Sequence, residues 1–353
     1  MVRNAPRIYS ITVTKKTNNS CDSTASSSLS IGEYMRARFN SVSVATILLL
    51  ALSAGGCAEQ KISETNETTI KEMDMSKYKT SKPKRVMRCL FIHHSCGGQW
   101  LAERGEANEM YPDTCLYTSH PNGGGLRSLL QRNNYEVHEA AYKSAIGEKT
   151  DVCDWNEKFR DRFSEILVCD GQDALYKDSS LKNDVVVFKS CFPNNEITSE
   201  GKEPGDPDSP VKSTANYKAA YTMLLGYFRK HPHTLFVCVT APPLVQNVPS
   251  RAKEFMKNII GAEDSVKAFG ERARRFNNWL KDAEKGWLEG YELKNVVVFD
   301  YYDLLTRQGE SNYLLYPTNS GNDSHPSAKG NYLATQKFIP FLNKTVNRFV
   351  GTR

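Results

Sequence analysis

Five short apolar runs, rich in β-branched residues, divide the C-terminal three quarters of the chain. Three of them (VVVF, LFVCV and VVVF) are continuously apolar instead of alternating with polar residues. Strands that are covered on both faces show this pattern, because neither side of the strand meets water. We therefore predict five buried strands at Val86–His93, Tyr135–Tyr142, Asp184–Ser190, Thr234–Thr240 and Asn295–Asp300.

Segments with helical periodicity lie between these runs. They predict helices at Gly125–Arg132, Asn156–Leu167, Ala215–Lys230, Ser265–Lys281 and Ser327–Phe349. Strand and helix in alternation imply right-handed crossovers and a parallel sheet with helices on both faces. The sequence thus predicts one α/β domain, a three-layer α/β/α sandwich with a five-stranded parallel sheet. In the last helix we expect Tyr332, Phe338, Phe341 and Leu342 to share one side.

The first 84 residues lack this pattern. Residues 1–34 are rich in Ser, Thr and Asn, and we interpret them as an upstream extension, with the natural start at Met35. A short basic stretch, an apolar core from Val42 to Ala54 and small residues then follow, as in a secretory signal. The ending Ala54-Gly55-Gly56-Cys57 resembles a bacterial lipoprotein box, which implies export to the cell envelope and a lipid on Cys57. A plain signal peptide cut near Gly56 is the alternative, and residues 58–84 are expected to form a polar tether.

Charge and cysteine content restrict the possible partners. The chain has a net charge of +6, but the first 56 residues carry +4 of it, so the rest is about +2 with no dense basic block. This excludes nucleic acid as an expected partner, and contact with a membrane is expected only through the lipid anchor. Seven cysteines follow Cys57, an odd number without a CxxC pair. Three lie in apolar runs, where we expect buried core thiols: Cys89, Cys191 and Cys238.

Reactive residue types follow the predicted strands. In an open parallel sheet, sites form at the carboxyl ends of the strands. Ser95 follows the first strand, and His325 with its neighbour Asp323 introduces the last helix. A serine hydroxyl becomes a nucleophile when an oriented histidine takes its proton. Gly147 after the second strand offers a backbone N–H, and Asn194 after the third offers a side-chain amide, for the oxyanion of a tetrahedral intermediate.

These blocks resemble the SGNH, or GDSL-like, hydrolases, a family named for a Ser, Gly, Asn and His on four separated blocks of a flavodoxin-like α/β/α domain. Ser95 matches block one, although His93-His94-Ser95 replaces Gly-Asp-Ser. Gly147, Asn194 and His325 match the other blocks in order. The resemblance covers about residues 86–345 and implies a hydrolase domain at 85–353 that needs no cofactor.

The third member of the triad is open at this point. The family places its Asp three residues before the His, where this chain has Asn322, whereas Asp323 lies two before. We favour Asp323 because it is the only acid nearby; assistance by Asn322 or by a backbone carbonyl is the alternative. His94 and Asn195 are expected to contact and support the catalytic residues without touching the substrate, and Trp100 is expected to line the site.

The sequence therefore predicts a serine ester hydrolase of the cell envelope that forms an acyl-enzyme on Ser95. Its expected partner is an ester substrate, for example an acylated glycan. An O-acyltransferase with the same triad and a non-catalytic glycan-binding lipoprotein are alternatives. No metal is expected; a metal site built from His93, His94, Asp323 and His325 is a weaker alternative.

Overall fold

The computed structural model describes residues 70–172, 180–246 and 262–351. The predictions for the extension, the signal and Cys57 fall outside these residues. Residues 70–84, part of the predicted tether, lie against the domain: Met73 and Met75 pack on the core. Near the end of the last helix, the side-chain amide of Asn347 donates to the carbonyls of Lys79 and Ser81. Within the described residues, no helix has the length and apolarity needed to cross a bilayer.

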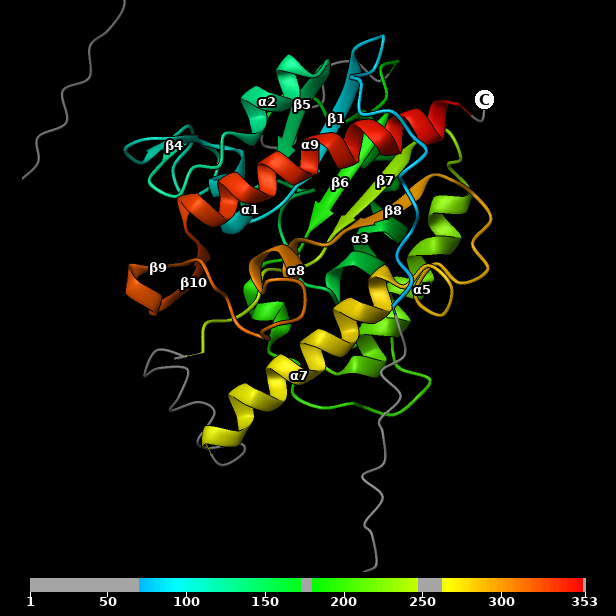
Figure 1. The fold of residues 1–353 in the computed structure, drawn as a ribbon. Coiled ribbons are helices and arrows are strands. Elements are labelled where there is room, and N and C mark those ends of the chain that lie inside the picture. Colours follow the sequence, from blue (N-terminus) through cyan, green and yellow to red (C-terminus); the bar gives the residue numbers. More distant parts are fainter. Residues whose placement is uncertain (1–69, 173–179, 247–261, 352–353) are drawn as a thin grey trace, which may run out of the picture. The chain divides into compact units, whose positions relative to one another are not determined.

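The five predicted strands are all present and form one parallel sheet (Figure 1). Their order is β5-β1-β6-β7-β8, in which the first strand along the chain has the second on one side and the third on the other. This is the flavodoxin-like order, and it creates a switch point at the carboxyl end of β1. The strands are β1 (Met87–Ile92), β5 (Tyr135–Ala140), β6 (Val185–Lys189), β7 (Leu235–Val239) and β8 (Val296–Phe299).

Alternate residues of each strand enter two separate cores. In β1, Cys89 and Phe91 pack on one face of the sheet and Leu90 and Ile92 on the other. The first core also takes side chains from α1 (Ser95–Leu101), α2 (Leu126–Arg132), α8 (Tyr301–Leu305) and α9 (Ala328–Val350). The second takes them from α3 (Asp154–Asp161), α4 (Phe163–Val168), α5 (Thr214–Arg229) and α7 (Ala262–Lys281). The three-layer sandwich predicted from the sequence is therefore observed.

Two details of the helix predictions were wrong. The segment predicted as one helix at Asn156–Leu167 is two helices, α3 and α4, separated at Arg162, whose backbone leaves the helical range. In α9, Phe338 and Leu342 are buried as expected, but Tyr332 is 57% exposed. Six residues separate Tyr332 from Phe338, which is far from a whole number of helical turns, so the two side chains face different directions.

Short strands that the sequence did not indicate build part of the rim around the carboxyl ends. A three-stranded sheet of order β2-β4-β3 lies between α1 and α2, and a two-stranded sheet pairs β9 with β10 before α9. A 3-10 turn, η1, follows β6, and another, η2, precedes β10. The bounds are β2 (Glu103–Arg104), β3 (Asn108–Glu109), β4 (Tyr117–His120), η1 (Phe192–Asn195), β9 (Pro317–Thr318), η2 (Asn319–Gly321) and β10 (Asp323–Pro326).

Candidate active site

The tight turn between β1 and α1 presents Ser95 at the carboxyl edge of the sheet. His94 is the last extended residue, and Ser95 is the first residue of α1. Gly97 and Gly98 permit this turn because a side chain at either position would collide with its surroundings. A Cβ on Gly97 would lie 2.4 Å from Cβ of His93, and one on Gly98 would lie 1.8 Å from the carbonyl oxygen of Cys115.

Ser95, His325 and Asp323 form a continuous chain of hydrogen bonds. Nε2 of His325 lies 3.0 Å from Oγ of Ser95, and Nδ1 lies 2.6 Å from Oδ1 of Asp323. The carboxylate requires the proton to be on Nδ1, which leaves Nε2 unprotonated and able to accept the serine proton. The structure thus joins a nucleophile and a base that are 230 positions apart in the sequence.

The carboxylate that contacts His325 belongs to Asp323. Its Oδ1 also accepts the backbone N–H of His325 at 2.9 Å, which fixes the orientation of both groups. Asn322 lies in the turn before β10, where its backbone N–H donates to the carbonyl of Asn319. Among the alternatives left open by the sequence, the geometry favours Asp323.

A network of His93, Glu139 and Arg127, the first two fully buried, supports the nucleophile turn. Nε2 of His93 lies 3.1 Å from Oε2 of Glu139, and Oε1 of Glu139 accepts from Nε of Arg127 at 2.6 Å. Nδ1 of His93 faces the carbonyl oxygen of His94 at 2.9 Å. Both ring nitrogens therefore have a polar partner inside the protein, which fixes the orientation of the ring. His93 therefore fixes the residue that precedes Ser95.

His94 has a separate task. Its Nε2 donates to the carbonyl of Gly147 at 2.8 Å, and its ring stacks on that of Tyr142 with 3.6 Å between ring centres. Burial lowers the pKa of His94 to about 4, so the ring is neutral at physiological pH. His94 therefore links the loop after β5 to the nucleophile turn.

The two groups predicted to bind the oxyanion are engaged elsewhere. The N–H of Gly147 donates to Oγ of Ser144 at 2.7 Å. The amide of Asn194 donates to Oδ1 of Asp151 at 2.8 Å, and its oxygen accepts the N–H of Val152 at 2.7 Å. Asn194 is buried. These two residues shape the loops after β5 and β6, and each donor already has a partner other than Ser95.

The backbone N–H of Ser95 is a donor that the sequence prediction left out. As the first residue of α1 it has no partner inside the helix. None of the hydrogen bonds found among the described residues uses it. It belongs to the nucleophile itself, so it lies close to any carbonyl that Oγ attacks and can donate to the resulting oxyanion.

Cys191 is a second residue that the sequence prediction left out. It was expected to be a core thiol, and it is buried, but its Sγ also lies 3.4 Å from Oγ of Ser95. A hydrogen bond from Cys96 and the nearby ammonium of Lys189 lower the pKa of Cys191, whereas burial raises that of Cys96. Cys191 is the second residue after β6, so its place at the strand end was the available signal.

Other side chains border the triad or hold its surroundings. The Phe192 ring meets the His325 ring edge-on at 5.0 Å between centres. Burial, and secondarily the proximity of His325, lowers the pKa of His120 in β4. Asn195 donates to the carbonyls of Ala241 and Pro242, as expected of a supporting residue. Trp100 does not line the site: it is fully buried and stacks on Tyr301, so that prediction was wrong.

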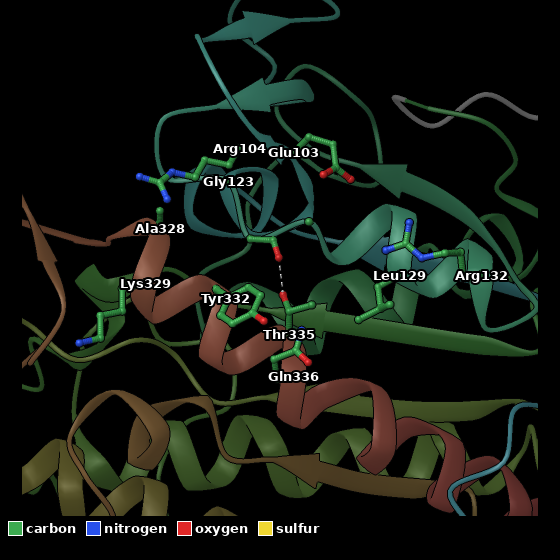
Figure 2. A pocket seen from close by; sticks show the side chains of 12 residues that line it. Glu103, Arg104, Gly123, Leu129, Arg132, Ala328, Lys329, Tyr332, Thr335 and Gln336 are labelled. Carbon is green, nitrogen blue, oxygen red and sulfur yellow. Dashed lines mark hydrogen bonds between the residues drawn. The ribbon is translucent and has the colours of Figure 1, made fainter.

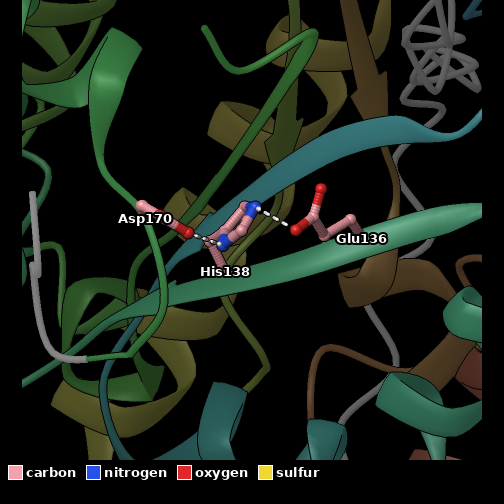
Figure 3. Close-up of side chains that lie close together, drawn as sticks. All are labelled: Glu136, His138 and Asp170. Carbon is pink, nitrogen blue, oxygen red and sulfur yellow. Dashed lines mark ion pairs between the residues drawn. The ribbon is translucent and has the colours of Figure 1, made fainter. Parts of the chain in front are cut away.

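The metal alternative does not fit the geometry, because His93 and His94 bind Glu139 and Gly147 instead of joining Asp323 and His325. A different group of possible ligands, Glu136, His138 and Asp170, clusters at the edge strand β5 (Figure 3). There the guanidinium of Arg88 lies 3.6 Å from both carboxylates. A cation already neutralises this cluster, so we interpret it as an ion-pair network.

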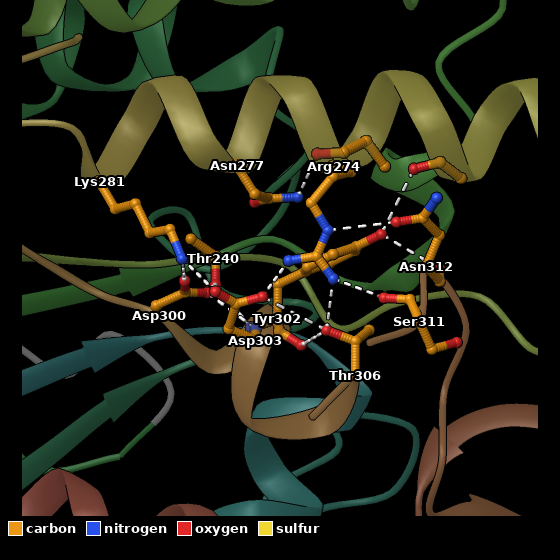
Figure 4. A network of polar contacts seen from close by, with 12 residues as sticks. Thr240, Arg274, Asn277, Lys281, Asp300, Tyr302, Asp303, Thr306, Ser311 and Asn312 are labelled. Atoms are coloured by element: carbon orange, nitrogen blue, oxygen red, sulfur yellow. Dashed lines mark hydrogen bonds and ion pairs between the residues drawn. The ribbon is translucent and has the colours of Figure 1, made fainter. Parts of the chain in front are cut away.

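A second polar network lies where β8 ends and ties α7 to α8 (Figure 4). Asp303 pairs with both Arg274 and Lys281, and the ammonium of Lys281 lies 2.8 Å from Oδ2 of Asp300. Burial raises the pKa of Asp300 to about 6. Because its charges are mutually paired, this network stabilises the carboxyl edge of the sheet without offering a reactive group.

The fold and the site together define an α/β/α protein with a Ser-His-Asp arrangement at its switch point. No family model matches the chain, and no curated protein matches its sequence. Solved structures do resemble it. One is a carbohydrate esterase family 2 enzyme with a carbohydrate-binding domain from Corynascus thermopiles (Myceliophthora fergusii), with 16% identity and a TM-score of 0.36 over 75% of this chain and 67% of that one.

Two further structures are similar to the same extent. A family two carbohydrate esterase from Clostridium thermocellum, in complex with cellohexaose, has 14% identity and a TM-score of 0.36 over 75% of this chain and 66% of that chain. A catalytic mutant of an acetylxylan esterase from Geobacillus stearothermophilus has 14% identity and a TM-score of 0.35 over 75% and 96%. At these values no conclusion about activity follows, and the argument for function rests on the site.

Proposed function

We propose that the protein is a serine ester hydrolase that forms an acyl-enzyme on Ser95. The observation that carries this proposal is the Ser95–His325–Asp323 chain, with contacts of 3.0 and 2.6 Å. A helix N-cap serine needs no such histidine, and a capping histidine needs no such carboxylate. The complete arrangement is the one that nucleophilic catalysis requires.

In the proposed reaction, Oγ of Ser95 attacks the ester carbonyl while Nε2 of His325 takes its proton. Asp323 stabilises the imidazolium, and the backbone N–H of Ser95 donates to the oxyanion. His325 then gives the proton to the leaving alcohol, and the acyl group remains on Ser95. Water, deprotonated by His325, releases the acid and restores the serine. The Sγ atom of Cys191, 3.4 Å from Oγ of Ser95, is a second polar neighbour of the nucleophile.

We further propose that the protein works in the bacterial cell envelope, exported by the segment that ends near Cys57 and held there by a lipid on this residue. Esters on envelope carbohydrates are then the substrates within reach. Metabolic labelling with an alkyne fatty acid should mark the wild-type protein and not Cys57→Ala. Equal labelling of the two proteins would contradict the anchor, without bearing on the triad.

Labelling with a fluorophosphonate probe tests the catalytic proposal directly. We expect one adduct, on Ser95, and turnover of p-nitrophenyl acetate by the wild type. Ser95→Ala should lose both, whereas Ser144→Ala, which changes a serine bonded to the Gly147 N–H, should keep the adduct on Ser95. Unchanged esterase activity in Ser95→Ala would overturn the proposal, and product analysis with an alcohol acceptor would identify acyl transfer.

A further inference from the structure

A hollow of about 510 Å³ is lined by residues of α9, β2 and α2 and by the glycines that precede α2 (Figure 2). This volume is within the usual range for small-ligand sites. We call it the cationic groove. Its lining includes three cations, one carboxylate, one aromatic ring and one amide: Arg104, Arg132, Lys329, Glu103, Tyr332 and Gln336.

The two arginines of the groove differ from the other arginines that the structure describes. Each of the others has an ion pair, a hydrogen bond or a ring contact. For Arg104 and Arg132 no such contact is found among the described residues. A guanidinium offers five donors in a fixed fork that fits carboxylate or phosphate oxygens. The ammonium of Lys329 lies over the Tyr316 ring, 5.5 Å from its centre. In the part of the chain that the structure describes, the two arginines remain without a partner, and the hollow has a single carboxylate in its lining, so the groove favours an anion.

The remaining lining favours a sugar. Tyr332 exposes 57% of its surface beside the groove, so its ring is accessible for a sugar to pack against. In Figure 2, Tyr332 lies between the end that carries Arg104 and Lys329 and the end that carries Arg132. Glu103 can accept hydrogen bonds from sugar hydroxyl groups and repels any anion close to it, which favours a chain whose charges are spaced apart over one with a charge on every unit. An aromatic platform, a hydroxyl acceptor and separated cations together match a chain of sugars that carries carboxylates.

The floor of the groove is hydrogen-bonded to a helix that carries part of the triad. Nε1 of Trp100 donates to Oγ1 of Thr335 at 2.9 Å, and this hydroxyl donates to the carbonyl of Gly124 at 2.8 Å. Trp100 belongs to α1, the helix that begins at Ser95. Ala328, which lines the groove, is three residues beyond His325 in the chain. One end of the groove is thus built on the elements that carry the triad.

We propose that the cationic groove binds an acidic stretch of the glycan, with sugar carboxylates on Arg104 and Arg132 and a sugar ring on Tyr332. This inference rests on the proposed function, since it names the class of chain that carries the ester. It adds a binding site about which the triad itself gives no information.

Calorimetry with tetragalacturonate and the Ser95→Ala protein tests the groove without requiring catalysis. We expect binding at least ten times tighter than that of the neutral cellotetraose. Arg104→Gln and Arg132→Gln should each weaken it about tenfold, and the double variant should show none. Tyr332→Ala should weaken binding more than Tyr332→Phe. The matched controls Lys337→Gln and Leu333→Ala, exposed on the same helix but outside the groove, should stay within twofold of the Ser95→Ala parent.

Wild-type affinity in the double arginine variant would overturn the inference, as would equal binding of cellotetraose. Tighter, arginine-dependent binding of octathymidylate would identify a phosphate-backbone surface and overturn it too. Loss of groove binding with Ser95-dependent esterase activity intact would remove this inference alone. Groove binding with esterase activity that survives Ser95→Ala would remove the proposed function instead.

Discussion

The two halves of the triad are positioned by different means. Ser95 stands on a turn backed by the core, where His93, Glu139 and Cys96 are all fully buried. His325 lies on the short strand β10, and the side chains of His325 and Asp323 are 22% and 30% exposed. The carbonyl of His325 accepts a hydrogen bond from Oγ1 of Thr318 at 2.8 Å. Apart from its contact with Ser95, the hydrogen bonds that hold His325 thus come from residues less than eight positions away in the chain. The nucleophile is held by long-range packing and the base by local bonds.

This difference predicts that substitutions on the base side cost activity alone, whereas those that support the nucleophile cost stability as well. The largest effect is expected for His325→Ala. Without the base, kcat/KM for p-nitrophenyl acetate should fall by about 10⁴-fold or more. The midpoint of thermal unfolding should stay within about 3 °C of the wild type, because the ring is partly exposed. A large drop in that midpoint would contradict the comparison.

Asp323→Ala and Asn322→Ala test which residue orients His325. Loss of the carboxylate removes the group that fixes the tautomer of His325, so kcat should fall by about 10²–10⁴-fold. Asn322→Ala should change kcat less than threefold. Steady-state kinetics on both variants identify the third member of the catalytic triad. Equal, small losses of kcat would show that Ser95 and His325 act as a pair.

Glu139→Gln tests the buried support of the turn that carries Ser95. It leaves the charge of Arg127 and the ring of His93 without their buried carboxylate, which should lower the free energy of unfolding by about 3 kcal/mol. Turnover should fall too, because His93 supports the residue before Ser95. Urea titration provides the measurement, and Glu136→Gln, on the same strand but half exposed, is the control, with an expected loss below about 1 kcal/mol. Similar values for both would refute the buried support.

Cys191→Ala should have a smaller effect. One hydrogen bond to Oγ of Ser95 is lost, so kcat should fall about five- to tenfold while KM is nearly unchanged. Cys191→Ser restores a polar partner for Oγ of Ser95 and should recover most of the rate. Cys153→Ala, a thiol without contact to Ser95, serves as the control. Wild-type kcat in Cys191→Ala would show that the sulfur contact is packing only.

The smallest effect concerns His94 and pH. The pKa of His94 is about 4 in the folded state and about 6.5 in the unfolded state, so the unfolded chain binds the extra proton between these values. Stability should therefore fall as pH drops from 6.5 to 4. Between pH 7 and pH 5, the free energy of unfolding of His94→Gln should therefore fall by about 1 kcal/mol less than that of the wild type. Parallel stability curves for the two proteins would show that the ring is not desolvated as described.

The parts of the fold that periodicity controls could be predicted. Short apolar runs, three of them continuous, located all five strands, and their alternation with helices gave the layers. The break at Arg162 and the two-residue strands β2, β3 and β9 could not be predicted, because such short elements have no period. Tyr332 was misplaced because an aromatic residue in a helix was assumed to be buried.

The site was predictable where chain order and residue chemistry agree. Ser95 and His325 were chosen because their chemistry is specific and each lies at the end of an element. Gly147 and Asn194 were given roles by analogy of order, but the direction in which a loop amide points depends on its local partners, here Ser144 and Asp151. Cys191 was set aside because a cysteine in an apolar run usually has only a packing role.

The sulfur beside Ser95 affects how inhibition data should be interpreted. Mercurials and maleimides are commonly used to diagnose a thiol enzyme, and loss of activity is then assigned to a cysteine nucleophile. In this protein, an adduct on Cys191 would fill the space 3.4 Å from the serine oxygen and stop turnover without involving a thioester. Sensitivity to such reagents would therefore report crowding at the serine, and only the mass of the trapped acyl peptide identifies the attacking atom.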